Sequence, residues 1–141
     1  MSKMEPDDDT VRHVPRALII QDEVALNKML KTMLEQMHML TFCETQTATA
    51  LKHYSQIHPD LVMLDIGMPG GWKTLDTIKE TKVLFRRPAI IILCDSRDPA
   101  TRLMGKLRGV EEYLLKSCTR EAVQVAVRRA INLDDLDDES R

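Results

Sequence analysis

The chain has 141 residues, of which 43% are hydrophobic and 30% charged, and its formal net charge is −2. This composition is typical of one globular domain, and no apolar run approaches the roughly 20 residues that a membrane-spanning helix needs. The polar, acidic N-terminus lacks the basic-then-apolar order of a secretory signal, so we expect a cytoplasmic protein. The cysteines are odd in number and without a CxxC pair, which favours reduced thiols over a disulfide framework; they are Cys43, Cys94 and Cys118.

Acidic side chains are concentrated at the two ends of the chain. Residues 1–15 carry a net charge of −2 and residues 133–141 a net charge of −4, so the whole-chain charge of −2 leaves +4 on residues 16–132. We therefore predict one domain at 16–132, between a disordered acidic N-terminal tail and an acidic C-terminal tail or linker. No stripe of Lys and Arg is interleaved with aromatic residues, so no direct nucleic-acid binding is expected.

Apolar runs alternate with segments of helical periodicity five times along the chain. The predicted strand segments, each mainly apolar, are 17–20, 40–43, 61–64, 89–93 and 112–115, and apolar residues at helical spacing follow each of them. Such an alternation predicts parallel strands joined by right-handed crossover helices. The expected fold is therefore a doubly wound α/β sheet, (βα)5, with the flavodoxin-like strand order 2-1-3-4-5.

The first three helices are predicted from periodicity and from helix-breaking residues. The first should cover 26–37 and pack a stripe of methionines into the core, namely Met29, Met33 and Met37. Thr47 can cap the second helix, which should continue to Ile57. The third should follow the Gly- and Pro-rich loop at 67–71 and extend to about Lys82.

The last two helices follow the fourth and fifth strands. Asp98 before Pro99 predicts an N-cap with proline at the first helical position, and Gly109 predicts the end of that helix. Its inward side chains are expected to be Leu103, Met104 and Leu107. The closing helix should bury Val123, Ala126, Val127, Ala130 and Ile131 and expose Arg120, Gln124 and Arg128.

Two acidic residues and one lysine follow these apolar runs. Asp22 comes directly after the first strand, Asp65 ends the third, and Lys116 follows the fifth. Adjacent strands lie about 4.8 Å apart, and the first and third are neighbours, so the two carboxylates should be close together. Either the pair shares a proton or a cation compensates its charge, and hard oxygen ligands favour Mg²⁺. An ammonium beside them suits phosphoryl transfer to a carboxylate, with Asp65 as the candidate nucleophile.

Three segments resemble the receiver domain of two-component response regulators. They are residues 19–23 (IIQDE), 59–70 (PDLVMLDIGMPG) and 109–116 (GVEEYLLK), and the similarity extends over about 16–133. The separations between these segments are close to those of the family. The resemblance implies a chemotaxis-regulator-like fold and a signalling phospho-acceptor, with at most self-catalysed phosphorylation and dephosphorylation as enzymatic activity.

The resemblance also implies roles for individual residues. Asp65 would accept a phosphoryl group from a sensor histidine kinase or phosphotransfer protein, and Lys116 would contact the phosphoryl oxygens. The Mg²⁺ would be held by Asp22, Asp65 and the Gly67 carbonyl. Tyr113 matches the switch aromatic, which turns inward on phosphorylation and so changes binding to a downstream protein target.

Four departures from the family pattern affect this site. Gln21 replaces the first of two consecutive acids, which holds the metal through water, and the lost charge should weaken Mg²⁺ binding about tenfold without abolishing it. Cys94 occupies the position of the switch Ser or Thr, and a thiol is a poorer donor than a hydroxyl. Ser117 replaces the proline that follows the lysine, so that loop should differ. The loop after the phospho-acceptor is about two residues shorter, which brings Gly71 and Trp72 nearer the site.

These departures leave alternatives open. A phosphorylatable receiver is the favoured function, and Gln21, Cys94 and Ser117 motivate a pseudo-receiver that binds proteins independently of phosphorylation. A flavodoxin-like FMN carrier has little support, because residues 21–24 are not the Ser-, Thr- or Gly-rich loop that would hold a phosphate.

The remaining expectations concern the surface. By family likeness, the fourth helix, fifth strand and fifth helix form the output surface and a candidate homodimer contact, with contacts expected from Arg102, Lys106, Tyr113 and Arg128. The histidines lack metal-like spacing and are expected at the surface; they are His13, His38, His53 and His58. Trp72 is either a partner contact or a cover over the third helix.

Overall fold

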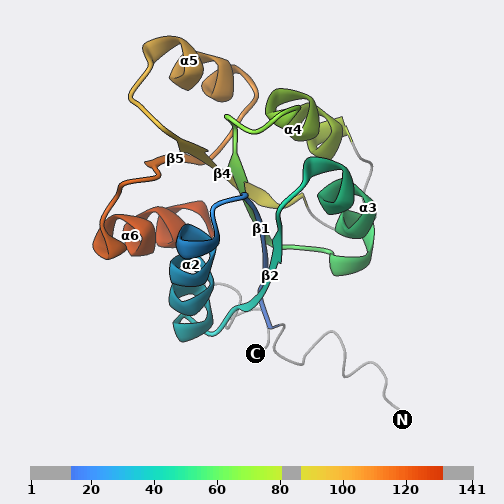
Figure 1. The fold of residues 1–141 in the computed structure, drawn as a ribbon, viewed down its shortest axis with the longest axis vertical. Coiled ribbons are helices and arrows are strands. Elements are labelled where there is room, and N and C mark those ends of the chain that lie inside the picture. Colours follow the sequence, from blue (N-terminus) through green and yellow to red (C-terminus); the bar gives the residue numbers. More distant parts are fainter. Residues whose placement is uncertain (1–13, 81–86, 132–141) are drawn as a thin grey trace.

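The computed structural model describes residues 14–80 and 87–131, which form a parallel five-stranded sheet with helices on both faces (Figure 1). The strand order β2-β1-β3-β4-β5 confirms the predicted topology. The strands are β1 (Arg16–Ile20), β2 (Leu40–Glu44), β3 (Leu61–Asp65), β4 (Ala89–Cys94) and β5 (Glu112–Leu115). Most of the predicted acidic N-terminal tail, the whole C-terminal one and the expected helix end at Lys82 lie outside the described residues.

Five helices connect and cover the strands within the described ranges. They are α2 (Val24–Gln36), α3 (Thr47–Ile57), α4 (Gly71–Glu80), α5 (Pro99–Leu107) and α6 (Arg120–Ala130). Successive side chains of a strand point to opposite faces, so Ala17 and Ile19 of β1 join one apolar cluster and Leu18 and Ile20 the other. The first cluster packs under α2 and α6 and the second under α3 and α4, on opposite sides of the sheet (Figure 1).

The packed faces of α2 and α6 agree with the sequence pattern. Met33 and Met37 are buried, and Met29 is partly buried against the same cluster, which confirms that the methionine stripe is core. The closing helix buries Val123, Ala126 and Val127 and packs Ala130 and Ile131 at the edge of that cluster.

The register of the central strands brings the loops after them together. Ile20, at the end of β1, pairs with Leu64, the residue before Asp65. Asp65 itself pairs with Leu93 of β4. Strands β3 and β4 are buried along their whole length, as is usual for a parallel sheet covered on both faces. The segments that follow the strands therefore emerge at one edge of the sheet, where sites of such folds assemble.

The starts of α3 and α4 differ from expectation. The N-cap of α3 is Gln46, whose side chain makes no capping hydrogen bond, so the prediction that Thr47 caps this helix is wrong. The Thr47 hydroxyl instead donates to the carbonyl of Pro69 at 3.2 Å and ties α3 to the loop after β3. Helix α4 begins at Gly71, where a Cβ would lie 2.5 Å from the Ile66 carbonyl oxygen. A side chain at this position would collide with the Ile66 carbonyl, so the glycine that was expected in the loop is required where the helix begins.

Helix α5 begins and ends as its sequence signals predict. Oδ1 of Asp98 accepts a hydrogen bond from the Ala100 amide at 3.1 Å, and Pro99 occupies the first helical position. Gly109 lies beyond the end of the helix with φ +74°, a conformation that other residues rarely adopt. Both signals are local, which is why they could be recognised without knowledge of the fold.

The buried face of α5 differs from the prediction. Leu103 and Leu107, expected to face inward, are 56% and 77% exposed, and Met104 is only partly buried. The buried residue of this helix is Gly105. A Cβ there would lie 2.8 Å from the Tyr113 ring, so the absence of a side chain allows α5 to approach β5 along this line. Close backbone approach, rather than the most apolar stripe, determines which face of α5 is turned inward.

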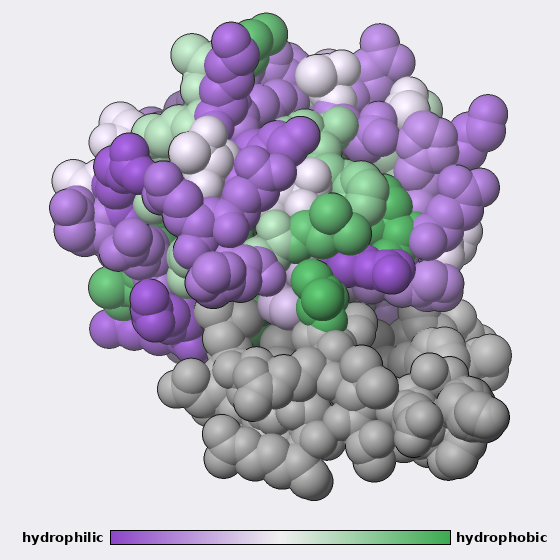
Figure 2. All heavy atoms as spheres, turned by 90° about the horizontal axis from the view of Figure 1, so that it is seen from below, coloured by the Kyte–Doolittle hydropathy of each residue, from purple (hydrophilic) through white to green (hydrophobic). Residues whose placement is uncertain are grey.

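Few large apolar side chains of the described residues are exposed. Figure 2 shows the molecule from below, where hydrophilic side chains predominate and apolar ones form small groups. The exposed large apolar side chains of the described residues are Val14, Val24, Leu40, Leu103, Leu107 and Val125. No helix within the described ranges combines the length and apolar character needed to cross a bilayer.

Candidate functional site

Charged side chains from four strand ends meet at one edge of the sheet. Asp22 and Glu23 follow β1, and Asp65 ends β3. Asp95 follows β4 and Lys116 follows β5. The structure therefore brings together the three residues predicted from the sequence, together with two further acids.

Lys116 lies at the centre of this group. Its Nζ is 2.6 Å from Asp65 Oδ2, 2.9 Å from Glu23 Oε2 and 3.3 Å from Asp95 Oδ1. The Asp65 side chain is 2% exposed, whereas those of Glu23 and Asp95 are largely open to solvent. The Gly67 amide donates to the other Asp65 oxygen, Oδ1, at 2.9 Å. Both oxygens of the buried carboxylate therefore have a donor.

The surroundings of Lys116 keep its amine protonated. Burial alone would lower the pKa of Lys116, but hydrogen bonds to Asp65 and Glu23 and the charge of Asp65 raise it above the ordinary value of a lysine. The site therefore contains a positive charge at neutral pH. A group with this charge, fixed against a buried carboxylate, is suited to stabilise an anionic substrate such as a phosphoryl group.

Three carboxylates of the group fit a divalent cation. Oxygens of Asp22, Glu23 and Asp65 lie within 4.8 Å of one another. Asp22 and Glu23 are exposed and Asp65 is buried, so water can complete the coordination shell from the solvent side. Hard oxygen donors of this kind are the ligands that Mg²⁺ prefers. The predicted contribution of the Gly67 carbonyl stays a prediction.

Gln21 is fully buried at the turn between β1 and α2. Its Oε1 accepts a hydrogen bond from the Glu23 amide at 2.7 Å, and its backbone carbonyl accepts one from the Asn27 side chain, also at 2.7 Å. Nε2 of Gln21 and Oδ1 of Asn27 are the buried side-chain polar atoms of the described residues that have no hydrogen-bond partner. The amide oxygen of Gln21 is thus engaged in the turn. Its predicted contact with the metal through water stays a prediction.

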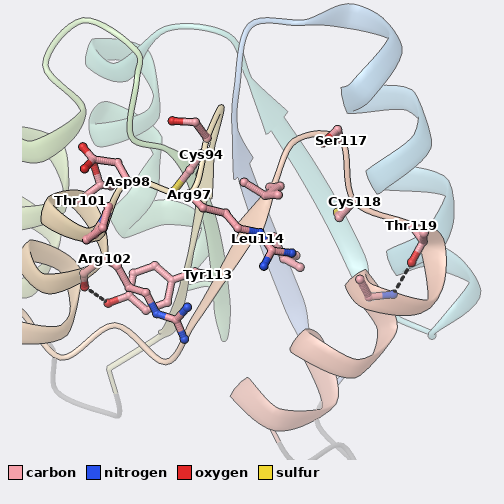
Figure 3. A pocket seen from close by; sticks show the side chains of 14 residues that line it. Cys94, Arg97, Asp98, Thr101, Arg102, Tyr113, Leu114, Ser117, Cys118 and Thr119 are labelled. Carbon is pink, nitrogen blue, oxygen red and sulfur yellow. Dashed lines mark hydrogen bonds between the residues drawn. The ribbon is translucent and has the colours of Figure 1, made fainter.

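A groove of about 680 Å³ lies between α5, β5 and the start of α6 (Figure 3). Cys94 and Tyr113, the two predicted switch positions, both line it. Cys94 is buried, and its carbonyl accepts the Lys116 backbone amide at 2.8 Å, which connects the groove to the charged site. Burial and, to a smaller extent, the charge of Asp65 raise the pKa of the Cys94 thiol, so it is neutral at neutral pH.

Tyr113 is held against α5. Its hydroxyl donates to the Arg102 carbonyl at 2.5 Å, and the Arg102 guanidinium carbon lies 5.5 Å from the ring centroid (Figure 3). The ring edge fits against Gly105. Burial raises the pKa of the Tyr113 hydroxyl, so it remains a donor. The hydroxyl, the ring face and the ring edge of this tyrosine all contact one helix.

Trp72 contacts the end of α5 through Arg108. The Arg108 guanidinium carbon lies 4.9 Å from the Trp72 ring, and Arg108 Nε donates to Asp76 Oδ1 at 2.8 Å. Arg108 Nη1 also donates to the Met104 carbonyl at 3.2 Å. Trp72 packs against the apolar cluster under α3 and α4 as well, which favours the predicted covering role.

Two other groups of predicted positions are less involved in the site. The described residues contain no cis peptide bond, so the loop at Ser117 is trans throughout.

The described histidines take no part in the site: His53 Nδ1 lies 2.9 Å from Glu44 Oε2. The one potential metal-ligand group found among the described residues contains no histidine. His13 lies outside those residues.

Sequence reasoning missed two acids at this site. Glu23 and Asp95 both contact Lys116, and each lies within three residues of a strand end. Asp22 and Asp65 were selected because they follow or end predicted strands, and the same criterion could have selected Glu23 and Asp95. Nothing comparable in the sequence indicated Gly105, because its role depends on how α5 packs against β5.

Known proteins with similar sequences include regulatory proteins and a sensor kinase/phosphatase. The family model described as response regulator receiver domain matches residues 17–128. Regulatory protein AtoC of Escherichia coli is 28% identical over 128 residues, which cover 91% of this chain and 28% of AtoC. KDP operon transcriptional regulatory protein KdpE of Escherichia coli is 27% identical over 114 residues, which cover 81% of this chain and 50% of KdpE. The chain thus spans half or less of the length of these two relatives.

Solved structures share the fold. The signal receiver domain of a Luxo repressor protein from Vibrio parahaemolyticus has a TM-score of 0.76 at 21% identity, over 90% of this chain and 95% of that one. Chemotaxis protein CheY4 of Vibrio cholerae has a TM-score of 0.76 at 17% identity, over 84% of this chain and 100% of that one. At these identities the likeness concerns the fold alone. Because the family model matches most of its length, this chain belongs to the response regulator receiver domains of two-component signalling.

Proposed function

We propose that the chain is a phosphorylatable receiver in which Asp65 accepts the phosphoryl group. The observation that carries this proposal is the Lys116 ammonium 2.6 Å from the buried Asp65 carboxylate, with the Asp22 carboxylate at the same edge. Receiver domains generally bind Mg²⁺ at an acidic pocket, and the three clustered carboxylates of this chain fit that ion. A nucleophile, a fixed positive charge and a cation site in one place are the parts that phosphoryl transfer requires.

The proposed reaction transfers a phosphoryl group from a histidine to an aspartate. A carboxylate oxygen of Asp65 attacks the phosphorus of a phosphohistidine on a sensor histidine kinase or phosphotransfer protein. A P–O bond forms as the P–N bond breaks, and the bonding electrons leave with the imidazole nitrogen, which then takes a proton from solvent. The donor is expected to dock at the open side of the site.

The side chains around Asp65 orient it for this attack. The Gly67 amide holds Oδ1 and Lys116 holds Oδ2, so the carboxylate is fixed before the donor arrives. The Lys116 ammonium lies next to the attacking carboxylate, so it can stabilise the charge that develops on the phosphoryl oxygens. Mg²⁺, when bound by the acidic cluster, supplies further positive charge to those oxygens.

The response to phosphorylation is proposed to reach partners through α5, β5 and α6. Cys94 and Tyr113 line one groove, and Cys94 is joined to Lys116 through its carbonyl. A thiol donates a weaker hydrogen bond than a hydroxyl, so coupling from the phosphoryl group to Tyr113 should be weaker than with Ser or Thr. A downstream protein or a second copy of the chain would contact Arg102, Lys106, Tyr113 and Arg128.

Labelling with acetyl phosphate tests the acceptor role of Asp65. The wild-type chain should gain a phosphoryl group in the presence of Mg²⁺, as measured by intact mass, and Asp65→Asn should not. Asp95→Asn is the matched control, because Asp95 also contacts Lys116 but is exposed and should not be needed for labelling. A wild-type protein that binds Mg²⁺ and stays unlabelled would overturn the proposal.

Two observations favour a second function, that of a pseudo-receiver which binds its partner without phosphorylation. The oxygen of the buried Gln21 is engaged in the β1–α2 turn, and the switch position holds the neutral thiol of Cys94. This function predicts that Asp65→Asn binds the partner as tightly as wild type does in an acetyl phosphate-treated sample. Loss of binding in that variant would argue against it.

A further inference from the structure

We infer that Glu23 is a third carboxylate ligand of the divalent cation and takes over the role of the acid that Gln21 replaces; this inference rests on the proposed metal-dependent function. The amide oxygen of Gln21 accepts the Glu23 backbone amide at 2.7 Å, within a fully buried side chain. Its amide nitrogen has no partner, but a donor nitrogen cannot bind a cation. The negative charge missing at Gln21 must therefore come from another residue if the site is to keep it.

Glu23 is placed to supply that charge. One of its carboxylate oxygens belongs to the group that lies within 4.8 Å of Asp22 and Asp65. Oxygens on opposite sides of a six-coordinate Mg²⁺ are about 4 Å apart, so a small rotation of this exposed side chain suffices to bring all three carboxylates onto one ion. Both the flexibility and the position needed for ligation are thus available at Glu23.

Lys116 does not prevent this rotation. Glu23 Oε2 contacts the ammonium at 2.9 Å, but Lys116 also contacts the buried Asp65 at 2.6 Å and the exposed Asp95 at 3.3 Å. If Glu23 turns towards the cation, the ammonium keeps two carboxylate partners. Cation affinity depends on the number of charged ligands, so a third carboxylate should be clearly measurable in Mg²⁺ binding.

Asp95 provides a matched control for the charge of Glu23. Both are exposed carboxylates that contact Lys116, but only Glu23 belongs to the metal-ligand group. In calorimetric titrations of the full chain with MgCl₂, Glu23→Gln should raise the Kd for Mg²⁺ by about tenfold or more, because it removes a charged ligand. Asp95→Asn should weaken it less than about threefold, because it removes only a solvent-screened charge. Equal losses in the two variants, or no loss in Glu23→Gln, would overturn the inference.

A second background tests whether Glu23 substitutes for the missing acid. Gln21→Asp should tighten Mg²⁺ binding about tenfold, and in that background Glu23→Gln should weaken the Kd by only about threefold, because another carboxylate is present. If Glu23→Gln weakens Mg²⁺ binding equally in both backgrounds, Glu23 does not replace the missing acid and the inference is overturned. Circular dichroism checks that each variant is folded. If wild type itself binds no Mg²⁺, the proposed function fails, whereas normal binding that is insensitive to Glu23→Gln overturns this inference alone.

Discussion

The charged edge of the sheet and the groove beside α5 differ in what holds their side chains in place. At the edge, Asp65 and Lys116 extend from strand ends, and the pairing of β1, β3, β4 and β5 fixes where they meet. In the groove, Tyr113 is held by one helix, and its position depends on the missing side chain of Gly105. The proposed phosphoryl-transfer site is therefore supported by four strands of the sheet, whereas the proposed switch depends on local helix packing that a single substitution can alter.

Removal of the ammonium should have the largest effect on the charged edge. Lys116→Met leaves the buried Asp65 carboxylate beside other acids, with the Gly67 amide still bonded to Oδ1. Removing one partner of a buried ion pair typically lowers the free energy of unfolding by about 3 kcal/mol. Mg²⁺ should restore part of this loss, because the proposed cation site exists only in the folded state and a bound cation would supply positive charge. Urea unfolding with and without Mg²⁺ measures both effects. As a control, Lys106→Met, at an exposed position of α5, should change the free energy of unfolding by less than about 0.5 kcal/mol.

In the groove, Gly105→Ala should change the stability by overpacking the contact between α5 and β5. The added Cβ would lie 2.8 Å from Ile92 Cδ1 and from Tyr113 Cε1. Overpacking costs about 1–3 kcal/mol, which should exceed the gain of about 1 kcal/mol from replacing glycine in a helix. We expect a net loss of stability in urea and a displaced Tyr113 ring in NMR spectra. The loss should shrink in a Tyr113→Ala background, and a stabilised Gly105→Ala single variant would contradict the packing argument.

The fold and the central site residues could be predicted because their signals are local in the sequence. The strand Glu112–Leu115 agrees with its prediction at both ends, and Asp22, Asp65 and Lys116 were identified by their positions after apolar runs. The inward face of α5 could not be predicted, because hydropathy selects the stripe of Leu103, whereas the close contact is made by a glycine that has no hydropathy signal. Contacts between side chains far apart in the chain, such as those of Arg108 with Trp72 and Asp76, leave no periodic pattern in the sequence.

Arg108 links the end of α5 to α4, the helix that follows the Asp65 loop. Its guanidinium contacts both the Trp72 ring and the Asp76 carboxylate. Arg108→Lys keeps the charge but loses the planar group that makes these two contacts. Because the contacts are partly exposed, we expect the free energy of unfolding to fall by about 0.5–1 kcal/mol. Trp72 fluorescence should shift at the same time, and Arg128→Lys on the exposed face of α6 should leave it unchanged. An unaltered Trp72 emission in Arg108→Lys would show that the stacked contact is absent in solution.

The smallest effect is expected from the titration of Cys94 in the groove. Burial, followed by the charge of Asp65, raises the pKa of this thiol above its ordinary value of 9.0. The folded protein therefore keeps the Cys94 proton at pH values where the unfolded chain loses it. The protonated thiol contributes fully to the free energy of unfolding below pH 9.0, and this contribution is lost as the pH rises towards the folded pKa. Cys94→Ser replaces the thiol with a hydroxyl that does not ionise there, so its urea midpoint should fall less than that of wild type between about pH 8 and 10. Cys118→Ser removes another thiol of raised pKa, but one that is less buried, and should reduce the fall by a smaller amount. If Cys94→Ser and wild type lose stability in parallel, the thiol ionises as readily in the folded groove as in the unfolded chain, and its role as a shielded neutral donor beside Asp65 would have to be abandoned.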